Sequence, residues 1–381
     1  MSSFAHGTPG QCRRSGSRLP ANATALNLEF KSNSQPTWSL PSQHDSAKFA
    51  SLQRVLHLVA PPACGLTFLG DSVSHDTYMA SLVGALHAGM TLEDCSWGAV
   101  VQPGVSTYLA AERIATCNGT DSWATSHLSD QRVGSSFQCA RLIVRHVPFL
   151  VKRKKGDAMA SPLEVSSWLS RLKDDVFKQP GSIVIMNIGL GANRGTDYEY
   201  LLENMARPAF DVAKLVPPRD RARLLWRETT PQHYRSYSGS GLYVDMRGNG
   251  TCAPIGKPAS GEASADQLRT ANWRNRQFER WSRMWRVRPA VASNPTRALL
   301  RNQTRVKARA NSTWLSNITW GAELPSGSAS LFHIILGTFT ALVPRWDLHI
   351  PPDCTHYCFA APLWEPLWAS AAELLSTVAV S

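Results

Sequence analysis

The sequence predicts an α/β protein in three layers, with helices on both faces of a parallel β-sheet. The apolar runs Leu66–Leu69 and Ile183–Ile188 have the length and composition of buried strands. Each is followed by a segment whose apolar residues keep helical spacing. Strands and helices that alternate in this way form parallel sheets, and ligands of such sheets bind beyond the carboxyl ends of the strands.

The other expected elements extend this alternation over most of the chain. In chain order we expect a helix over Ala47–Val59, a strand at Leu66–Leu69, a helix from Ser72 to about Leu86, a strand at Leu142–His146, a helix over Pro162–Phe177, a strand at Ile183–Ile188, a helix over Tyr198–Leu215 and a strand at Arg223–Trp226. The apolar run Ser330–Val343 is too short to cross a bilayer, which takes about 20 residues.

Composition divides the chain into two parts. Residues 1–45 are rich in Ser, Pro, Gly and Arg and lack periodicity, which predicts a disordered or linker segment. Residues 46–381 are expected to form one domain with insertions at about 91–139 and 255–315. The first insertion carries three cysteines and a sequon, so we expect a disulfide-stapled surface loop rather than a core element.

An arginine-dense stretch from Gln267 to Arg309 contains interleaved aromatic residues. Trp281, Met284 and Trp285 have the spacing of one helix face. Such a face is either a core contact with the arginines in solvent, or a groove in which tryptophans stack on sugars and arginines pair with carboxylates.

Charge and covalent features indicate the compartment and the class of partner. The net charge of +12 would suit nucleic acid, an anionic membrane or an acidic polysaccharide, but no zinc-finger or RNP-type motif favours nucleic acid. The eight cysteines lack paired CxxC spacing, which favours disulfides in an oxidising compartment. Glycosylation sequons lie at Asn22, Asn118, Asn249, Asn302, Asn311 and Asn317.

These features predict a protein of the secretory pathway, in the Golgi lumen or associated with its membrane, with an extracellular location as the alternative. The first twenty residues contain no apolar signal segment. We therefore expect the start of the chain to be incomplete, with any membrane anchor outside this sequence.

Ser72 is the candidate nucleophile. It follows Gly70 and Asp71 at the point where the first strand passes into a helix. A helix N-terminus offers backbone N–H groups and a positive dipole end to a developing oxyanion. Gly-Asp-Ser is also a common turn composition, so the assignment requires a general base elsewhere in the chain.

Asp353 and His356 supply that base near the far end of the sequence. Their spacing of three puts both side chains on one side of a turn, so that Asp353 holds the imidazole while His356 takes the Ser72 proton. Asp347 and His349, two apart, form a second candidate pair in extended chain. A metal site, or a histidine bonded to a loop carbonyl, is the alternative for either pair.

The order of these motifs resembles the SGNH (GDSL-type) hydrolase superfamily, in particular its PC-esterase branch of trichome birefringence-like polysaccharide O-acetyltransferases. The likeness covers roughly Phe49 to Leu375. Its ordered blocks are Gly70-Asp71-Ser72 with Ser81-Leu82, Asn187-Ile188-Gly189, Arg227 to Cys252, Asn317-Ile318-Thr319 with Arg345-x-Asp347-x-His349, and Asp353-Cys354-Thr355-His356-Tyr357-Cys358 with Pro362-Leu363-Trp364 and Leu374-Leu375.

The resemblance implies a flavodoxin-like SGNH domain that transfers an acyl group, most simply acetyl, to a glycan hydroxyl through an acyl-Ser72 intermediate. It implies a Ser72–His356–Asp353 triad, with the Ser72 amide and either Gly189 or Asn193 as oxyanion donors. We also expect a substrate-binding group made of Asp71, His75, Asp76 and His233.

The expected reactants are an acetyl donor, such as acetyl-CoA or an acetylated intermediate, and a polysaccharide or oligosaccharide acceptor. We expect no bound cofactor and no metal. A carbohydrate O-acetyl esterase, or an inactive secreted glycan-binding protein, is the alternative function. The family pattern also implies a disulfide from Cys354 or Cys358 to the core, with Cys252 as the favoured mate.

The chain departs from the family pattern close to the expected site. His75-Asp76 stands where plant relatives carry Arg-Asn, and Leu190 to Asn193 replaces a His-Trp-Trp sequence. The run Ser330–Val343 interrupts the spacing between two blocks. We expect these differences to alter the acceptor site more than the triad.

Overall fold

The structure is a computed structural model. It describes residues 28–29, 37–38, 50–87, 95–100, 112–118, 141–148, 169–190, 192, 194–247, 252–256, 263–283, 286–287, 329–335, 337–349, 353–357 and 361–378. All structural statements below concern these residues.

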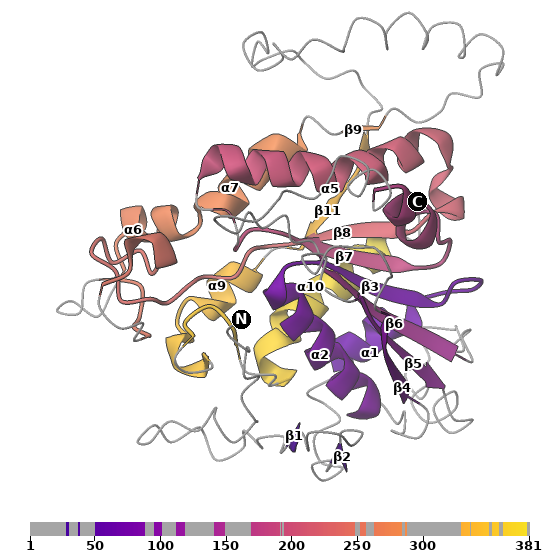
Figure 1. Cartoon of the computed structure of the whole chain (residues 1–381), viewed down its shortest axis with the longest axis horizontal. Helices are drawn as coiled ribbons and strands as arrows, with labels where there is room; N and C mark the ends of the chain where they lie inside the picture. The colour runs from indigo at the N-terminus through magenta and orange to yellow at the C-terminus, as the bar shows by residue number, and fades with distance from the viewer. Residues whose placement is uncertain are drawn as a thin grey trace, which may run out of the picture.

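A seven-stranded sheet with the order β11-β8-β7-β3-β6-β5-β4 forms the centre of the molecule (Figure 1). The five strands β11, β8, β7, β3 and β6 run parallel, whereas β5 and β4 continue the sheet antiparallel. Their bounds are β3 Gly65–Gly70, β4 Cys95–Val100, β5 Glu112–Asn118, β6 Arg141–Pro148, β7 Ile183–Asn187, β8 Arg223–Arg227 and β11 His333–Ile335. Two-residue ladders join β1 Leu28–Glu29 to β2 Thr37–Trp38, and β9 Arg286–Val287 to β10 Ala329–Ser330.

Helices cover both faces of the sheet because alternate strand residues point to opposite sides. Ile183 and Ile185 of β7 belong to one apolar cluster, and Val184 and Met186 to another. The first cluster is covered by α1 Ala50–His57, α2 Ser72–His87 and α10 Ala361–Val378. The second is covered by the π-helical turn η4 Leu172–Phe177, α5 Gly195–Leu215 and α7 Trp273–Ser282. The short helices are η5 Pro218–Asp220, η6 Tyr243–Asp245, α6 Ala265–Ala271, α9 Thr338–Leu342 and η7 Trp346–Leu348.

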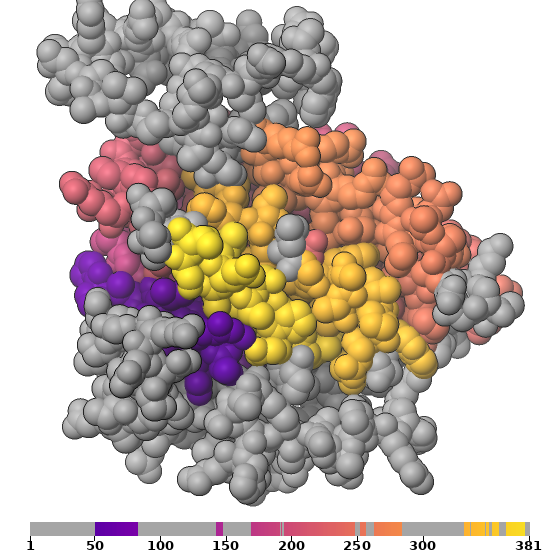
Figure 2. All heavy atoms as spheres, turned by 180° about the vertical axis from the view of Figure 1, so that it is seen from behind, coloured from indigo at the N-terminus to yellow at the C-terminus, as the bar shows by residue number. Residues whose placement is uncertain are grey.

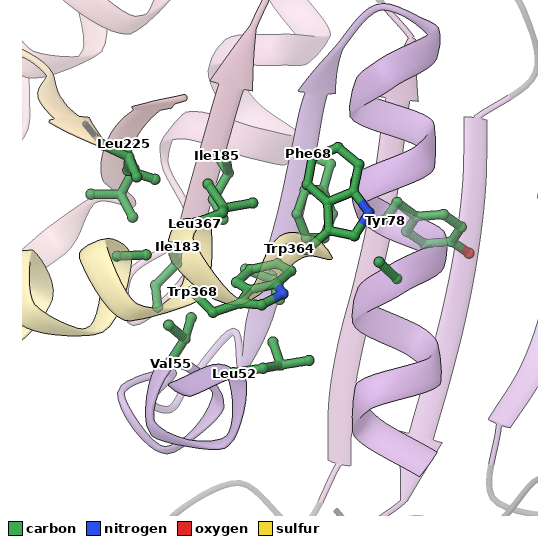
Figure 3. Close-up of a cluster of buried hydrophobic side chains, with 14 of the residues drawn as sticks. Leu52, Val55, Phe68, Tyr78, Ile183, Ile185, Leu225, Trp364, Leu367 and Trp368 are labelled. Carbon is green, nitrogen blue, oxygen red and sulfur yellow. The ribbon is translucent and has the colours of Figure 1, made fainter. Parts of the chain in front are cut away.

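The C-terminal helix α10 closes the first cluster. Its Trp364, Leu367 and Trp368 are at most 2% exposed. Figure 3 shows these side chains gathered against Phe68 and Ile185 of the sheet. From behind, the yellow α10 lies against indigo N-terminal residues, in agreement with the packing of α10 on α1 (Figure 2).

The predicted alternation of strands and helices is confirmed, but the expectation for the first insertion is wrong. The 91–139 stretch is not only loop, because β4 and β5 lie within it and extend the sheet edge. The run Ser330–Val343 belongs to the fold, because it supplies β11, which pairs with β8, and then α9. The predicted linker at 1–45 is described only at β1 and β2.

The predicted disulfide between Cys252 and Cys354 is confirmed. Its alternative through Cys358 lies outside the described residues. Cys64 is also disulfide-bonded. Within the described ranges, no helix is long and apolar enough to cross a membrane.

Candidate active site

Ser72 lies just beyond the carboxyl end of the central strand β3, and it is the first residue of α2. Gly70 permits this turn, because a Cβ there would lie 1.8 Å from the backbone oxygen of Asn187 on the neighbouring strand. The side chain of Ser72 is exposed between the buried residues Asp71 and Val73. Ser72, the candidate nucleophile, is therefore exposed to solvent, while its chain neighbours are held in the protein interior.

Asp71 is a structural clamp rather than a surface group. One carboxylate oxygen accepts the Val73 N–H at 3.2 Å and caps α2. The other accepts the N–H groups of Gly189 and Leu190, both at 3.1 Å. With only 3% of its surface exposed, Asp71 ties the loop after β7 to the start of α2.

This clamp bears on the predicted oxyanion donors. The Gly189 N–H is committed to Asp71, so a role for it in catalysis requires that bond to be shared or broken. The Ser72 N–H makes no hydrogen bond to any described residue and remains the available donor at the helix N-terminus. Asn193, the other predicted donor, lies outside the described residues.

Asp353 and His356 form the predicted pair. Nδ1 of His356 is hydrogen-bonded to a carboxylate oxygen of Asp353. The other oxygen of Asp353 accepts the Thr355 N–H at 2.7 Å and the Tyr234 hydroxyl at 3.2 Å. Nε2 of His356 has no hydrogen-bond partner among the described residues, so it is free to accept a proton. This is the orientation that a general base requires.

The surroundings shift the pKa values of this pair in opposite directions. Burial raises the pKa of Asp353, but hydrogen bonds and the charge of His356 outweigh it and lower the value to about 2. Burial lowers the pKa of His356, but the Asp353 hydrogen bond and the charges of Asp76, Asp353 and Asp71 raise it to about 9. His356 is therefore mostly protonated near pH 7.

The loop of Asp353 and His356 packs against the first turns of α2. The Asp76 carboxylate, one turn after Ser72, accepts the Tyr357 N–H and interacts electrostatically with His356. Asp71, directly before Ser72, also acts on His356. The structure thus brings the loop of the predicted base His356 to the start of α2, where the predicted nucleophile Ser72 lies, and no hydrogen bond joins Ser72 directly to His356.

The loop is held from behind by the segment after β8. The His233 N–H donates to the Cys354 carbonyl at 2.9 Å, and the Tyr357 hydroxyl donates to the Pro231 carbonyl at 2.9 Å. Nε2 of Gln232 donates to the Thr355 hydroxyl at 3.2 Å. The Cys252–Cys354 disulfide adds a covalent tie to the same loop.

Two buried histidines form a second support. Nε2 of His233 faces the Val343 carbonyl at 2.8 Å, Nδ1 of His233 faces Nε2 of His349 at 2.6 Å, and Nδ1 of His349 faces the His356 carbonyl at 3.0 Å. Carbonyls only accept, so Nε2 of His233 and Nδ1 of His349 each donate a proton to the carbonyl that they face. Burial lowers the pKa of His349 well below its ordinary value, so that ring stays neutral near pH 7.

His349 therefore supports residues 353–357, here called the triad loop after the predicted triad. It is 3% exposed and its ring nitrogens are occupied. The side chain of its predicted partner Asp347 lies outside the described residues. Within the described ranges, no three His, Cys, Asp or Glu side chains lie close enough together to hold a metal ion.

The predicted substrate-binding group is buried. Asp71, His75, Asp76 and His233 are at most 8% exposed, and the His75 ring packs at 5.2 Å from the His146 ring. None of the four side chains therefore offers much surface to solvent, and their role in substrate binding stays a prediction.

A buried arginine completes the polar layer under Ser72 and was not anticipated from the sequence. Arg227 at the end of β8 is 1% exposed. Burial lowers its pKa to about 10, although the charges of Asp71 and Asp76 act to raise that pKa. Its Nη2 and one oxygen of Asp76 are buried without a hydrogen-bond partner among the described residues. Burial raises the pKa of Asp76 to about 7.

Tyr234, whose hydroxyl donates a hydrogen bond to Asp353, was also missed by the sequence analysis, although it directly follows His233 in one of the blocks of the family resemblance.

Comparison of the sequence with protein-family models gives no match, and a search of curated proteins gives none either.

Proposed function

We propose that the protein is a serine-dependent O-acyltransferase of the SGNH type that moves an acyl group, most simply acetyl, to a glycan hydroxyl. The observation that carries this proposal is the hydrogen-bonded Asp353–His356 pair, on a loop that contacts the first turns of α2, the helix that begins at the exposed Ser72. The motif order of the PC-esterase family supports the acetyl and glycan parts.

In the first half-reaction, Oγ of Ser72 attacks the carbonyl carbon of the donor while Nε2 of His356 takes its proton. The carbonyl oxygen becomes an oxyanion that the Ser72 amide and the N-terminus of α2 stabilise. The bond from the carbonyl carbon to the leaving group then breaks, and His356 returns the proton to that group. Acetyl-Ser72 is left behind.

In the second half-reaction, a sugar hydroxyl gives its proton to His356 and attacks acetyl-Ser72. The Ser72 ester bond breaks, Oγ regains the proton, and the acetylated sugar leaves. Water in place of the sugar gives an esterase, so exclusion of water from the site decides the outcome. Acid–base help of this kind is worth about 10²–10⁴ in rate, and one oxyanion donor about 10²–10³.

The decisive experiment is mass spectrometry after incubation with an activated acetyl ester, which should acetylate Ser72 in the wild type and leave Ser72→Ala unlabelled. His356→Ala should slow labelling by at least about 10². Absence of label on Ser72 in folded protein would leave the inactive glycan-binding alternative. Transfer is separated from hydrolysis by adding oligosaccharides: acetylated sugar must appear, and acetate release must fall as acceptor rises.

We further propose that the protein works in the secretory pathway. The Cys252–Cys354 disulfide supports an oxidising compartment. Localisation of the tagged full-length protein tests this, and a cytosolic location with both thiols reduced would contradict it.

A further inference from the structure

A short hairpin between β8 and α6 gathers much of the exposed apolar surface. The segment Tyr234–Arg247, here called the tyrosine hairpin, is held by a bridge between Ser236 and Met246. Five large apolar side chains are exposed within the described ranges, and three of them lie on this hairpin: Tyr237 at 75%, Tyr243 at 53% and Val244 at 53%. The hairpin is the coil that leads toward α6 in Figure 1.

The charge on this surface is positive. Arg235 and Arg247 are both exposed and are paired across the hairpin, where the Arg247 N–H donates to the Arg235 carbonyl at 2.6 Å. The Arg247 guanidinium lies 5.6 Å from the centre of the Tyr237 ring. The nearby Asp245 carboxylate is engaged by the N–H and hydroxyl of Ser238.

The hairpin is connected to the triad loop by two routes. The Tyr243 ring lies 5.2 Å from the Tyr234 ring, and the Tyr234 hydroxyl donates to Asp353. The Tyr243 N–H donates to Gln232 at 3.3 Å, and Gln232 in turn donates to Thr355. A ligand on the exposed tyrosines would therefore lie next to the triad loop.

We propose that the tyrosine hairpin is the acceptor subsite, and that it binds an oligosaccharide carrying carboxylates, such as uronic acid residues. This rests on the proposed function and adds to it the charge class of the acceptor. Tyrosine faces stack on the C–H face of sugar rings, and exposed guanidinium groups pair with carboxylates through two parallel hydrogen bonds.

Of the two alternatives for the arginine-dense stretch, the described part of α7 favours the core contact. Its Phe278 and Trp281 side chains are at most 6% exposed and belong to the core, where Phe278 stacks on Trp226. Arg274 is 3% exposed and donates to the Ala192 carbonyl. Met284 and Trp285 lie outside the described residues.

An anionic membrane would also attract tyrosine and arginine side chains. The connection of Tyr243 to Asp353 through Tyr234 favours a substrate instead, because a membrane anchor has no need of contact with a catalytic carboxylate. The membrane and the sugar acceptor can be distinguished by testing vesicles and oligosaccharides as separate ligands.

The test measures binding to the full-length Ser72→Ala protein by calorimetry, so that no turnover is involved. The ligands are an oligogalacturonide, a neutral xylo-oligosaccharide of equal length, and vesicles with about one third phosphatidylserine. We expect Tyr237→Ala and Tyr243→Ala each to weaken oligogalacturonide binding at least tenfold. Arg235→Gln with Arg247→Gln should remove the preference over the neutral sugar.

The matched control is Tyr200→Ala, which removes a tyrosine of similar exposure, 55%, from α5 and should bind as the parent does. Unchanged binding in both hairpin tyrosine variants overturns the proposal, as does binding to vesicles alone. Acetylation of Ser72 is measured separately, in the wild-type protein. If the hairpin variants lose sugar binding but wild-type Ser72 is not acetylated, the sugar subsite is supported and the acyltransferase function is rejected.

Discussion

Replacement of Asp76 by Asn should move the pH dependence of Ser72 acylation to lower pH. Asp76 is buried beside His356 and, when ionised, raises the pKa of that imidazole, which stands at about 9. Only neutral His356 can take the Ser72 proton. The acylation rate of the wild type should therefore rise with pH and level off above about 9.

The size of the shift follows from the kind of contact. An opposite charge within about 4–6 Å shifts a pKa by about 1–3 units, and Asp76 ranks below the Asp353 hydrogen bond among the groups that raise the pKa of His356. A fall of about one unit corresponds to about 1.4 kcal/mol. At pH 7 it would increase the neutral fraction of His356 about tenfold, so the Asn variant should be faster there.

The substitution is close to isosteric. The amide oxygen of Asn can still accept the Tyr357 N–H that Asp76 now accepts. A matched control is Asp266→Asn, whose side chain is 83% exposed on α6. It should leave the profile in place.

The assay is kcat/KM for an activated acetyl ester between pH 5.5 and 10, because this parameter reports the pKa of the free enzyme. The reasoning would be refuted if the midpoint of the kcat/KM profile of the Asp76→Asn variant lay at the same pH as that of the wild type or at a higher pH. A wild-type midpoint near the ordinary histidine value would also refute it, because His356 would then not carry the raised pKa on which the argument depends.

Three further predictions address the supports of the site. Tyr234→Phe removes the hydroxyl that donates to Asp353 and should lower kcat/KM about fivefold, the equivalent of about 1 kcal/mol, without altering the fold. Replacement of both Cys252 and Cys354 by Ser opens a tie across 102 residues and should cost up to about 4.7 kcal/mol of unfolding free energy, measured by urea unfolding without reductant. Trp364→Ala leaves a cavity in the core under α10 and should cost about 3–5 kcal/mol in the same assay.

Each has its own control and contrary result. Tyr200→Phe should match the wild type, and a Tyr234→Phe variant equal to it would show that the Asp353 contact is dispensable. Equal urea midpoints for the parent and the Cys252→Ser, Cys354→Ser double variant would contradict the disulfide prediction. For the core, Leu215→Ala serves as the exposed counterpart, and a loss below about 1 kcal/mol at Trp364 would mean that the cavity collapses.

The elements that the sequence predicts best are the long or strongly apolar ones. The β3–α2 junction, β7 and α5 lie within a few residues of the expected bounds, because buried strands and amphipathic helices leave a local periodic pattern. β4 and β5 leave no such pattern among cysteines and turn residues, and they become strands only through pairing, β5 with β6 and β4 with β5. β11 is three residues long, too short for periodicity to identify.

The site divides in the same way. Asp353 and His356 can be predicted from spacing, since the hydrogen bond between them is local to one turn. The burial of Asp71, His75 and Asp76 could not be predicted, because it depends on the loops after β7 and β8 and on the C-terminal segment. These residues have the polar side chains that are typical of a substrate site, but they lie buried beneath the surface of the protein.

The docking of α10 links the core to the catalytic geometry. This helix packs on α1, α2 and β11, and begins at Ala361, just after the triad loop. The fully buried Tyr357 ring lies 6.3 Å from Trp364, so the end of the loop is packed on the first turn of α10. A cavity at Trp364 should lower activity more steeply with temperature than a cavity of equal cost on the other face of the sheet, such as Phe177→Ala, because only the first loosens His356.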